Sequence, residues 1–497
     1  MNSPNIIIFN PDQWRSDVMG CHGNSAAVTP FIDDFVSNEA VSFSNAFCQN
    51  PVCTPSRCSF MTGWYPHVRG HRTMHHMLHP EYDEPNLLKI LKDDGYFVWW
   101  GGKNDLVPGQ DGYEKYCDIK FQLDKQKLKE RGLTYRNGLH GTVEEWRKNR
   151  EDDNIYNFFA GVLDQEDEEY YCDDDWAIVL SAIDFIQNYD GDKPYCIFMP
   201  LLYPHPPYGV EQKYFDMIDQ SKLPPRVPAT ENPETKPMIL DGIRQGQKTE
   251  NYGEEFWDNL RAVYYGMCAR LDDQFCMLMD ALKKMDQYDN SAVFLFSDHG
   301  DFTGDYSLVE KTQNTFEDCL TKVPFIIKPP KGTNIANGVN EELVELVDFP
   351  ATVYDLLNLE VDYDHFGKSL LPVMAGDVKE IRNAAFCEGG RMMGEVQASE
   401  SQSYNENSLY LPRIQLQISD EKPWHGKAVM CRTKNYKYVS RYYENDEFYD
   451  LTKDPSEEFN QINNPEYATK IAEHKQILLE WYMATCDVVP RKADRRG

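Results

Sequence analysis

A single cysteine, Cys53, stands in a setting that a structural thiol does not need. It begins the segment Cys-Thr-Pro-Ser-Arg, which ends at Arg57 and continues as CSFMTGWYPHVRG to Gly70. Cys58 follows, but the stretch contains no Cys-x-x-Cys pair of the kind that binds zinc. Taken without its neighbours, Cys53 would be interpreted as a buried, inert thiol. The adjacent proline and arginine raise the question of whether residue 53 takes part in chemistry.

Two pairs of neighbouring polar residues could hold a cation. Asp12 and Gln13 form one pair, and Asp298 and His299 form the other. Any one of them alone could be an ordinary turn residue. Together they offer carboxylates, an amide oxygen and an imidazole, a set in which oxygen ligands predominate and which suits a hard divalent cation. The nitrogen ligand widens the choice to Mg²⁺ or Mn²⁺.

The balance of charge restricts the partners. Lysine and arginine number 50 against 81 acidic residues, which gives a formal net charge of −31 at pH 7. Such acidity disfavours nucleic acid and anionic membranes. A small anionic substrate remains compatible, because screening limits exposed charges to about 8–10 Å, provided that cations gather locally. The candidates are Arg57, Lys103, His205 and Lys311, although each alone could be a solvated charge or, for His205, a loop histidine.

The elements that must position these residues follow from the apolar pattern. Continuous runs rich in β-branched and aromatic residues predict strands buried on both faces, as in a parallel sheet. Each run is followed at once by candidate residues, and the runs are Asn5–Phe9, Tyr96–Trp100, Tyr195–Tyr203 and Ala292–Phe296. Helical patterns lie between them, which predicts a wound α/β sheet. Ligands of such sheets bind beyond the carboxyl ends of the strands, so we expect the polar clusters to converge.

A change in composition divides the chain. The Pro-rich stretch Ser221–Pro237 is interpreted as an extended surface loop. Beyond Phe366–Asp377 come short strand-like runs and a closing helix near Glu466–Cys486. We therefore predict a catalytic α/β domain over residues 1–377 and a smaller α+β domain over residues 378–497, with an antiparallel sheet and the closing helix.

Location is predicted from what the sequence lacks. No apolar run approaches the roughly 18 residues needed to span a bilayer, and the beginning, MNSPNIIIFNPDQ, has neither a basic n-region nor an apolar h-region. We expect a cytoplasmic protein, in which the 13 cysteines are mostly reduced and buried.

The segment from Cys53 resembles the signature of the type I sulfatases, the formylglycine-dependent sulfatases of the alkaline phosphatase superfamily. Further segments resemble landmarks of that family in the family's order, over nearly the whole chain. They read PNIIIFNPDQ, GGKNDL, PHPPY, FSDHGDFTGDYSLVEK, VPFIIKPP, LVDFPATVYDLLNL, FGKSLLPVMAG and EFYDLTKDPSEEFNQ. The resemblance implies an alkaline-phosphatase-like wound sheet flanked by helices.

The resemblance also implies a cofactor chemistry. In the family the first cysteine of the signature, here Cys53, is oxidised to formylglycine by a separate sulfatase-maturing enzyme, which would be a transient partner. One hydroxyl of the hydrated aldehyde attacks the sulfate, and the second expels it as the aldehyde reforms. The implied metal is Ca²⁺, with Mg²⁺ or Mn²⁺ as alternatives. Its ligands would be Asp12, Gln13, residue 53, Asp298 and His299.

The four cations receive roles by the same resemblance. Arg57 would steady the diol and the metal shell, and Lys103 and Lys311 would hold the sulfate oxygens as charge develops. His205 would protonate the leaving oxygen.

The sequence departs from the family pattern at several positions. The family commonly has Trp-His where this chain has Asn104-Asp105. Asp105 could replace that histidine as the base that removes the second diol proton, or could contact substrate. Gln13 stands where a second aspartate is frequent, and Tyr306 stands where many relatives have histidine. We expect the change at Tyr306 to affect the substrate side.

Contacts to the rest of the substrate are harder to assign. Candidates are Arg72, His75, Arg391 and His425, each of which could equally lie in a solvated loop. Five histidines crowd residues 67–79, but their spacing gives no tetrahedral zinc pattern. A loop that rims the pocket is the preferred interpretation.

The sequence therefore predicts a sulfatase that hydrolyses a sulfate ester, or a sulfamate, of a small imported carbohydrate. An enzymatic alternative is a phosphonate monoester or phosphodiester hydrolase of the same superfamily, because relatives of that kind share the aldehyde and an Asp-Gln first motif. A second alternative is an inactive relative that binds a sulfated ligand.

Overall fold

A mixed sheet forms the centre of the molecule. The computed structural model describes residues 3–82, 84–136, 158–165, 168–229, 235–401, 408, 410–419, 421–491, 493 and 495–496. The sheet runs β11-β2-β10-β8-β1-β6-β3-β4, with β9 paired to β2. Its strands are β1 (Asn5–Asp12), β2 (Val41–Phe47), β3 (Phe97–Trp100), β4 (Ile119–Lys120), β6 (Tyr195–Pro204), β8 (Ser291–Phe296), β9 (Lys322–Val323), β10 (Phe325–Lys328) and β11 (Gly338–Glu345).

The strands predicted from the apolar runs are direct neighbours. β8, β1, β6 and β3 lie side by side, and each adjacent pair is parallel. Their carboxyl ends therefore meet at one edge of the sheet, as the sequence predicted. Antiparallel pairing enters through β10, which pairs with β8 and β2, and makes the sheet mixed rather than wholly parallel.

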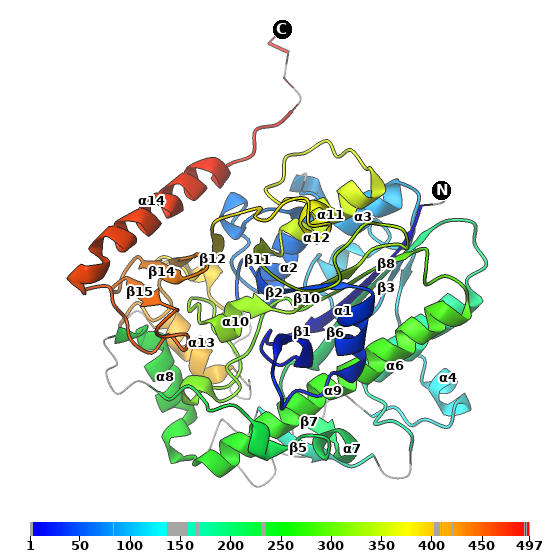
Figure 1. The fold of residues 1–497 in the computed structure, drawn as a ribbon, viewed down its shortest axis with the longest axis horizontal. Helices are drawn as coiled ribbons and strands as arrows, with labels where there is room; N and C mark the ends of the chain where they lie inside the picture. The colour runs from blue at the N-terminus through cyan, green and yellow to red at the C-terminus, as the bar shows by residue number, and fades with distance from the viewer. Residues whose placement is uncertain are drawn as a thin grey trace.

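Helices cover both faces of this sheet (Figure 1). Along β1 the side chains alternate, so that Ile7 and Phe9 enter one core and Ile6 and Ile8 enter the other. The first core is completed by α1 (Pro30–Asn38), α6 (Asp174–Asn188) and α9 (Glu254–Lys284). The second is completed by α2 (Cys53–Thr62), α3 (Leu87–Asp93), α11 (Asp348–Leu357) and α12 (Leu371–Met374). Because β1 is covered on both faces, its sequence is a continuous apolar run.

Local signals start two of the predicted helices. The side chain of Asp173 accepts a hydrogen bond from the backbone N–H of Trp176 at the start of α6. Asn86 does the same for Leu88 at the start of α3. Each cap satisfies one of the donors that a helix start leaves unpaired.

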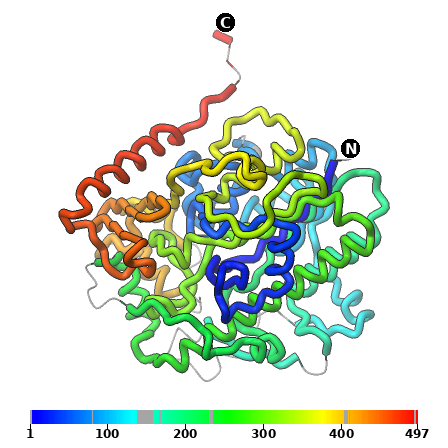
Figure 2. Tube along the Cα trace, in the orientation of Figure 1, coloured from blue at the N-terminus to red at the C-terminus, as the bar shows by residue number. Residues whose placement is uncertain are grey.

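A second sheet lies toward the C-terminus. Its strands β12 (Ala385–Gly389), β13 (Ala428–Arg432), β14 (Tyr436–Arg441) and β15 (Glu447–Asp450) are antiparallel in that order. Helix α14 (Ala468–Thr485) packs on it through Trp481 and Leu478. Figure 2 follows the chain from the central first strand to this helix at the periphery. The predicted antiparallel sheet and closing helix are confirmed, and the division at residue 377 stays a prediction.

The remaining elements connect these layers. β5 (Phe159–Leu163) pairs with β7 (Tyr208–Glu211) in a small parallel sheet. Within the described residues, the other α-helices are α4 (Lys125–Glu130), α7 (Gln212–Phe215), α8 (Met238–Gln247), α10 (Asp318–Thr321) and α13 (Leu411–Ile418). Residues 230–234 of the predicted Pro-rich loop lie outside the described residues.

Two expectations about composition can be compared with the fold. Within the described residues, no helix combines the length and the apolar character required to cross a membrane. The cysteines are free and mostly buried, as expected, and Cys58 packs in the core beneath the sheet.

Candidate active site and metal centre

Two carboxylates meet where β1 and β8 end. Asp12 is the last residue of β1, and Asp298 follows β8 by two residues. Arg57 joins them, since its Nη2 lies 3.0 Å from Asp12 Oδ2 and its Nε lies 2.9 Å from Asp298 Oδ2. All three side chains are buried. A buried guanidinium is tolerated when carboxylates surround it in this way, and these contacts raise its pKa further above the ordinary value in spite of burial.

A group of side chains that could hold a cation lies beside the ion pairs of Arg57. Ligand atoms of Asp12, Cys53, Asp298 and His299 all lie within 4.8 Å of one another. The Nδ1 atom of His299 lies 2.9 Å from the Gly300 carbonyl oxygen, which can only accept, so Nδ1 carries the proton. Burial lowers the pKa of this imidazole. The ring is therefore neutral and turns the Nε2 lone pair toward Cys53 Sγ, 3.3 Å away. Two carboxylates and an oriented imidazole fit a divalent cation.

Gln13 adjoins the group, but its amide is engaged elsewhere. Its Oε1 accepts a hydrogen bond of 2.7 Å from Lys311 Nζ, and its Nε2 donates to Asp301. The backbone at Gln13 has φ 72°, a conformation that costs a non-glycine residue free energy. The predicted ligand Gln13 thus lies at the site, but its side-chain oxygen accepts a hydrogen bond from Lys311.

Cys53 is the first residue of α2, and the helix starts against the metal group. Ser56 fixes this start by donating a 2.6 Å hydrogen bond to the carbonyl of Asp298. The N-terminus of a helix favours anions, which places a partial positive charge at residue 53. Burial, and then the charge of Asp12, nevertheless raises the pKa of the Cys53 thiol to about 12. The unmodified side chain is therefore a protonated thiol at neutral pH.

Lys103 reaches the same point from the end of β3. Its Nζ lies 2.8 Å from Asp12 Oδ2, 2.8 Å from Asp105 Oδ2 and 3.5 Å from Cys53 Sγ. Gly102 makes this approach possible, because it has φ 68° and a Cβ there would stand 2.0 Å from the carbonyl oxygen of Pro200. Burial opposes the charge of Lys103, but Asp105 and Asp12 outweigh it and raise the lysine pKa well above its ordinary value.

The charge on Asp12 is stabilised by the same arrangement. Burial alone would raise the pKa of this carboxyl, but Lys103, His205 and Arg57 hold it well below its usual range. Asp12 is therefore a carboxylate at neutral pH, which a cation ligand requires.

Lys311 reaches Gln13 from a loop with strained backbone conformations. Its Nζ is 2.5 Å from Glu310 Oε1 as well as 2.7 Å from Gln13 Oε1. Glu310 has φ 70° and Thr303, earlier in the loop, has φ 46°. Such conformations persist where the surroundings over-determine them, and they concentrate at functional sites.

His205 follows β6 and completes the set of cations. Its Nδ1 lies 2.6 Å from the carbonyl oxygen of Pro206, so Nδ1 carries the proton of the neutral ring. Its Nε2 lies 3.2 Å from the hydroxyl of Tyr410. When its ring is protonated, His205 acts after Lys103 to lower the pKa of Asp12, so this histidine belongs to the same electrostatic site.

The residues predicted for wider substrate contact lie around the C-terminal segments. Arg72 donates to the carbonyl of Gly390 at 2.9 Å, and Arg391 donates to the carbonyl of Gln417. His425 is buried, and neither of its ring nitrogens has a hydrogen-bond partner within the described residues. His75 is half-buried in the loop that touches Thr54 through the Met74 carbonyl.

The histidine-rich loop has structural roles in part. His67 lies 2.7 Å from Glu388, and His71 lies 2.8 Å from Glu84. Both therefore stabilise the loop. Tyr306, which replaces the frequent histidine, donates its hydroxyl to the carbonyl of Ser456.

Several site residues had not been predicted. Asp301 accepts from Gln13 and from the Tyr208 hydroxyl. Asp301 stands two residues after His299 within the motif FSDHGDFTGDYSLVEK, so that motif could have indicated its role. Tyr410 and Arg413, which lie beside His205 and Lys311, had no comparable signal in the sequence.

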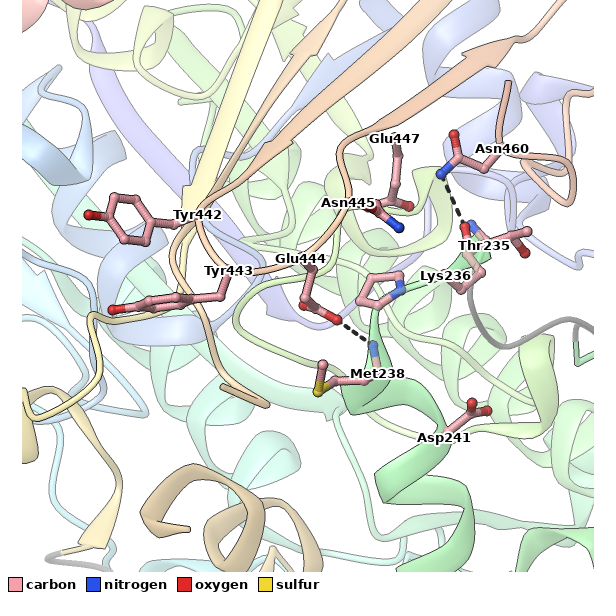
Figure 3. A pocket seen from close by; sticks show the side chains of 11 residues that line it. Thr235, Lys236, Met238, Asp241, Tyr442, Tyr443, Glu444, Asn445, Glu447 and Asn460 are labelled. Carbon is pink, nitrogen blue, oxygen red and sulfur yellow. Dashed lines mark hydrogen bonds between the residues drawn. The ribbon is translucent and has the colours of Figure 1, made fainter. Parts of the chain in front are cut away.

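A cavity of about 730 Å³ opens elsewhere, between the start of α8 and the turn after β14 (Figure 3). Tyr442, Tyr443, Glu444 and Asn445 line it on the side of the turn. None of the residues predicted for catalysis is among its lining residues, so this cavity is separate from the candidate site.

Comparison with known proteins identifies the family. The family model named Sulfatase matches residues 4–359. The chain is 25% identical to an arylsulfatase of Clostridium perfringens, over 96% of this chain and 94% of the relative. It is 22% identical to an N-acetylglucosamine-6-O-sulfatase of Bacteroides thetaiotaomicron, over 96% and 86%. The phosphonate monoester hydrolase of Agrobacterium radiobacter has the same fold, with a TM-score of 0.75, 21% identity and 99% of each chain covered.

Proposed function

This chain belongs to the sulfatase family and is a sulfuric ester hydrolase, and from that premise we propose that it hydrolyses a sulfate ester, or a sulfamate, of a small carbohydrate. The nucleophile would be formylglycine made from Cys53. The carbohydrate assignment is supported by the relative that acts on N-acetylglucosamine 6-O-sulfate, and residues of this chain support the chemistry.

One observation carries the proposal. Cys53, the carboxylates Asp12 and Asp298, and the cations Lys103 and Lys311 converge on one buried point from separate elements. Two lysines beside a carboxylate-rich group of metal ligands suit a sulfate monoester. Their positive charges can compensate the negative charge of the sulfate oxygens.

Modification of Cys53 is the first requirement. Conversion of the thiol to an aldehyde is an oxidation, so a separate maturation enzyme must perform it, and that enzyme would be a transient partner. Once formed, the aldehyde hydrate supplies one hydroxyl as nucleophile and a second whose deprotonation expels sulfate and restores the aldehyde. The start of α2 supplies the anion-favouring end of a helix at this residue.

The group of ligands fits a divalent cation, which would be held by Asp12, Asp298, His299 and residue 53. Gln13 could join them if its amide oxygen turned away from Lys311. We propose Ca²⁺, with Mg²⁺ or Mn²⁺ as alternatives. A bound cation would polarise the sulfate and lower the pKa of the attacking hydroxyl.

The chain's own residues would perform the remaining steps. Lys103 and Lys311 hold the sulfate oxygens while the bond between sulfur and the leaving oxygen breaks and its electron pair moves to that oxygen. As the imidazolium, which carries a proton on Nε2 as well as on Nδ1, His205 gives the Nε2 proton to the leaving oxygen and returns to the neutral ring. Asp105 forms an ion pair with Lys103 and is proposed to accept the second diol proton or to contact substrate. Arg57 keeps the carboxylates of Asp12 and Asp298 in place.

A sulfate-release screen tests the proposal. The protein would be produced together with a sulfatase-maturing enzyme and supplied with defined sulfated mono- and disaccharides. Mass spectrometry of the peptide that spans Cys53 would check for the aldehyde. Release from at least one sugar sulfate is the expected result. If a sample that carries the aldehyde binds these sugars but releases no sulfate from them, the alternative of an inactive relative would be supported.

A second activity is favoured by one specific feature. The Asp12-Gln13 pair resembles the Asp-Gln first motif of aldehyde-dependent phosphonate monoester and phosphodiester hydrolases, and such an enzyme shares the fold. Sulfate monoesters and phosphate diesters each carry one negative charge, so the two lysines suit both. Turnover of 4-nitrophenyl sulfate would be compared with that of bis(4-nitrophenyl) phosphate. A preference of orders of magnitude for the diester would replace the sulfatase proposal.

The cellular setting is also a proposal. A cytoplasmic enzyme acting on an imported sugar sulfate, without nucleic acid or membrane partners, agrees with the strong acidity of the chain.

A further inference from the structure

The first turn of α13 lies against two of the proposed catalytic cations. Tyr410 directly precedes the helix, and Arg413 is its third residue. These residues follow Lys311 by about a hundred positions and His205 by about two hundred. Residues three apart lie on the same face of a helix, so one turn of backbone presents both side chains to the catalytic loops.

Tyr410 contacts the ring of His205. Its hydroxyl lies 3.2 Å from Nε2, the nitrogen left without a proton when Nδ1 binds the Pro206 carbonyl. The phenol therefore donates to the neutral imidazole. Burial, and then the charge of Glu310, raises the pKa of Tyr410 above its ordinary value, so the phenol keeps its proton at neutral pH.

The position of the Tyr410 ring is fixed from two sides. Its centroid lies 6.0 Å from that of Phe158, in an edge-to-face arrangement. The guanidinium of Arg413 lies 4.7 Å from the ring centroid. Such a cation–π contact is strongest when the pair is desolvated.

Arg413 in turn ties the helix to the loop of Lys311. Its Nη1 lies 2.8 Å from Glu310 Oε2 and 3.0 Å from the carbonyl oxygen of Lys311. Its Nη2 lies 3.0 Å from Glu400 Oε2. Since Glu310 also binds Lys311 Nζ, a buried chain of alternating charges runs from the proposed sulfate-binding lysine to α13. One helix turn thus sets His205 and Lys311 relative to each other.

We propose that Tyr410 is a positioning residue that aims His205 at the leaving oxygen, and that Arg413 holds Tyr410 in place. The inference rests on the proposed function, in which His205 protonates that oxygen. Before substrate binds, the Tyr410 hydroxyl donates to Nε2 of the neutral ring, and its oxygen can accept from Nε2–H of the imidazolium. The leaving oxygen of a bound substrate then takes the place of that hydroxyl on Nε2–H, so the ring is already in the orientation from which the proton is given.

The proposal predicts an effect that depends on the leaving group. Phenol is a much poorer leaving group than 4-nitrophenol, so its departure depends more on proton donation. In the matured protein, Tyr410→Phe should lower kcat for phenyl sulfate by about tenfold to a hundredfold and kcat for 4-nitrophenyl sulfate by less than about threefold. Tyr442→Phe is the matched control, because its ring is 66% exposed at the distant turn after β14. It should change neither rate.

A double-mutant cycle tests whether Tyr410 acts through His205. In a His205→Ala background, Tyr410→Phe should cause no further loss on phenyl sulfate. An Arg413→Lys variant keeps the charge but cannot bind Glu310 and Glu400 through two separate nitrogens. It should reproduce the leaving-group-dependent loss. The combined effect of Arg413→Lys and Tyr410→Phe should be smaller than the product of the two separate effects.

The outcomes separate the inference from the function beneath it. Equal losses on the two aryl sulfates, or full additivity with His205→Ala, would overturn the positioning role while the sulfatase proposal stands. A matured wild type that releases sulfate from neither the aryl sulfates nor any of the sugar sulfates would contradict the proposed function, and the inference with it. Thermal unfolding of each variant near the wild-type midpoint would show that the fold is retained.

Discussion

The two sides of the candidate site are built in different ways. On the nucleophile side, Asp12, Asp298 and Cys53 stand at the ends of adjacent secondary-structure elements, and Arg57 joins the carboxylates across them. On the leaving-group side, His205 and Lys311 stand in loops, and α13 connects them through Tyr410 and a chain of ion pairs. The first arrangement follows from strand order, whereas the second depends on a helix brought from far along the chain.

The difference shows how each side is stabilised. Parallel pairing fixes the spacing of β1 and β8, so one buried arginine suffices to hold the two carboxylates. The loop of Lys311 has no such frame and contains positive φ values at Thr303, Tyr306, Ser307 and Glu310. Its conformation is maintained by the buried ion pairs of Glu310 with Lys311 and with Arg413 of α13. We therefore expect damage to the nucleophile side to abolish activity, and damage to the other side to reduce activity selectively.

Removal of the nucleophile should have the largest effect. Cys53→Ala takes away the residue that becomes formylglycine, and kcat should fall by at least about 10⁴-fold. The fold should remain, because the change deletes one sulfur atom. Sulfate release and thermal unfolding would be measured together. Cys58→Ala, in the same helix but in the core, is the matched control and should stay active. Full activity of Cys53→Ala would end the covalent mechanism.

Loss of a metal carboxylate should rank next. Asp298→Asn removes an anionic ligand and leaves Arg57 short of a partner, so turnover should fall by about 10³-fold. The unpaired buried charge should lower stability by about 3 kcal/mol.

Calorimetry with and without Ca²⁺ or Mn²⁺ would check the metal role of Asp298. The wild type should gain about 2.7 kcal/mol at a metal concentration of about 100 Kd, and the variant should gain much less. Asp289→Asn at the exposed Lys331 pair is the control. An Asp298→Asn variant with the wild-type metal response would remove Asp298 from the ligand set.

The lysine on the leaving-group side should have a smaller effect. Lys311→Met leaves Gln13 Oε1 without its lysine and Glu310 with Arg413 alone. It also removes one cation from the sulfate, so kcat should fall by about 10²-fold. Steady-state kinetics on an aryl sulfate would measure it, with Lys331→Met at the surface as control. A loss as complete as that of Cys53→Ala would erase the expected contrast between the two sides.

The smallest expected effect concerns stability alone. Burial, and then the charges of Arg413, Arg391 and Arg72, lowers the pKa of His425 to about 3. Below about pH 6.5 the unfolded imidazole binds a proton that the folded one refuses, so stability falls as the pH decreases toward 3. The slope from this residue approaches about 1.4 kcal/mol per pH unit.

His425→Gln should flatten that part of the stability profile. Chemical denaturation at a series of pH values between 4 and 8 would measure it. An unchanged profile would show that His425 titrates normally in the folded protein.

The residues at the strand ends, on both sides of the site, could be predicted from the sequence. The apolar runs of β1, β3, β6 and β8 gave the strands, and the rule that ligands bind beyond parallel strand ends placed Asp12, Lys103, His205 and Asp298 together. The group of Asp12, Cys53, Asp298 and His299 has the spacing of a cation site. The roles of these residues and of the candidate contacts near Arg72 and Arg391 stay predictions.

The sequence by itself determined the strands, the helices and the short motifs, because side-chain periodicity and turn residues act over a few positions. Only the tertiary structure decided that Gln13 would bind Lys311, that Arg57 would bridge two carboxylates and that Tyr410 would reach His205. Contacts of that kind join residues separated by 45 to about 300 positions. Their geometry depends on how packed layers fit together, which no local pattern of residues encodes.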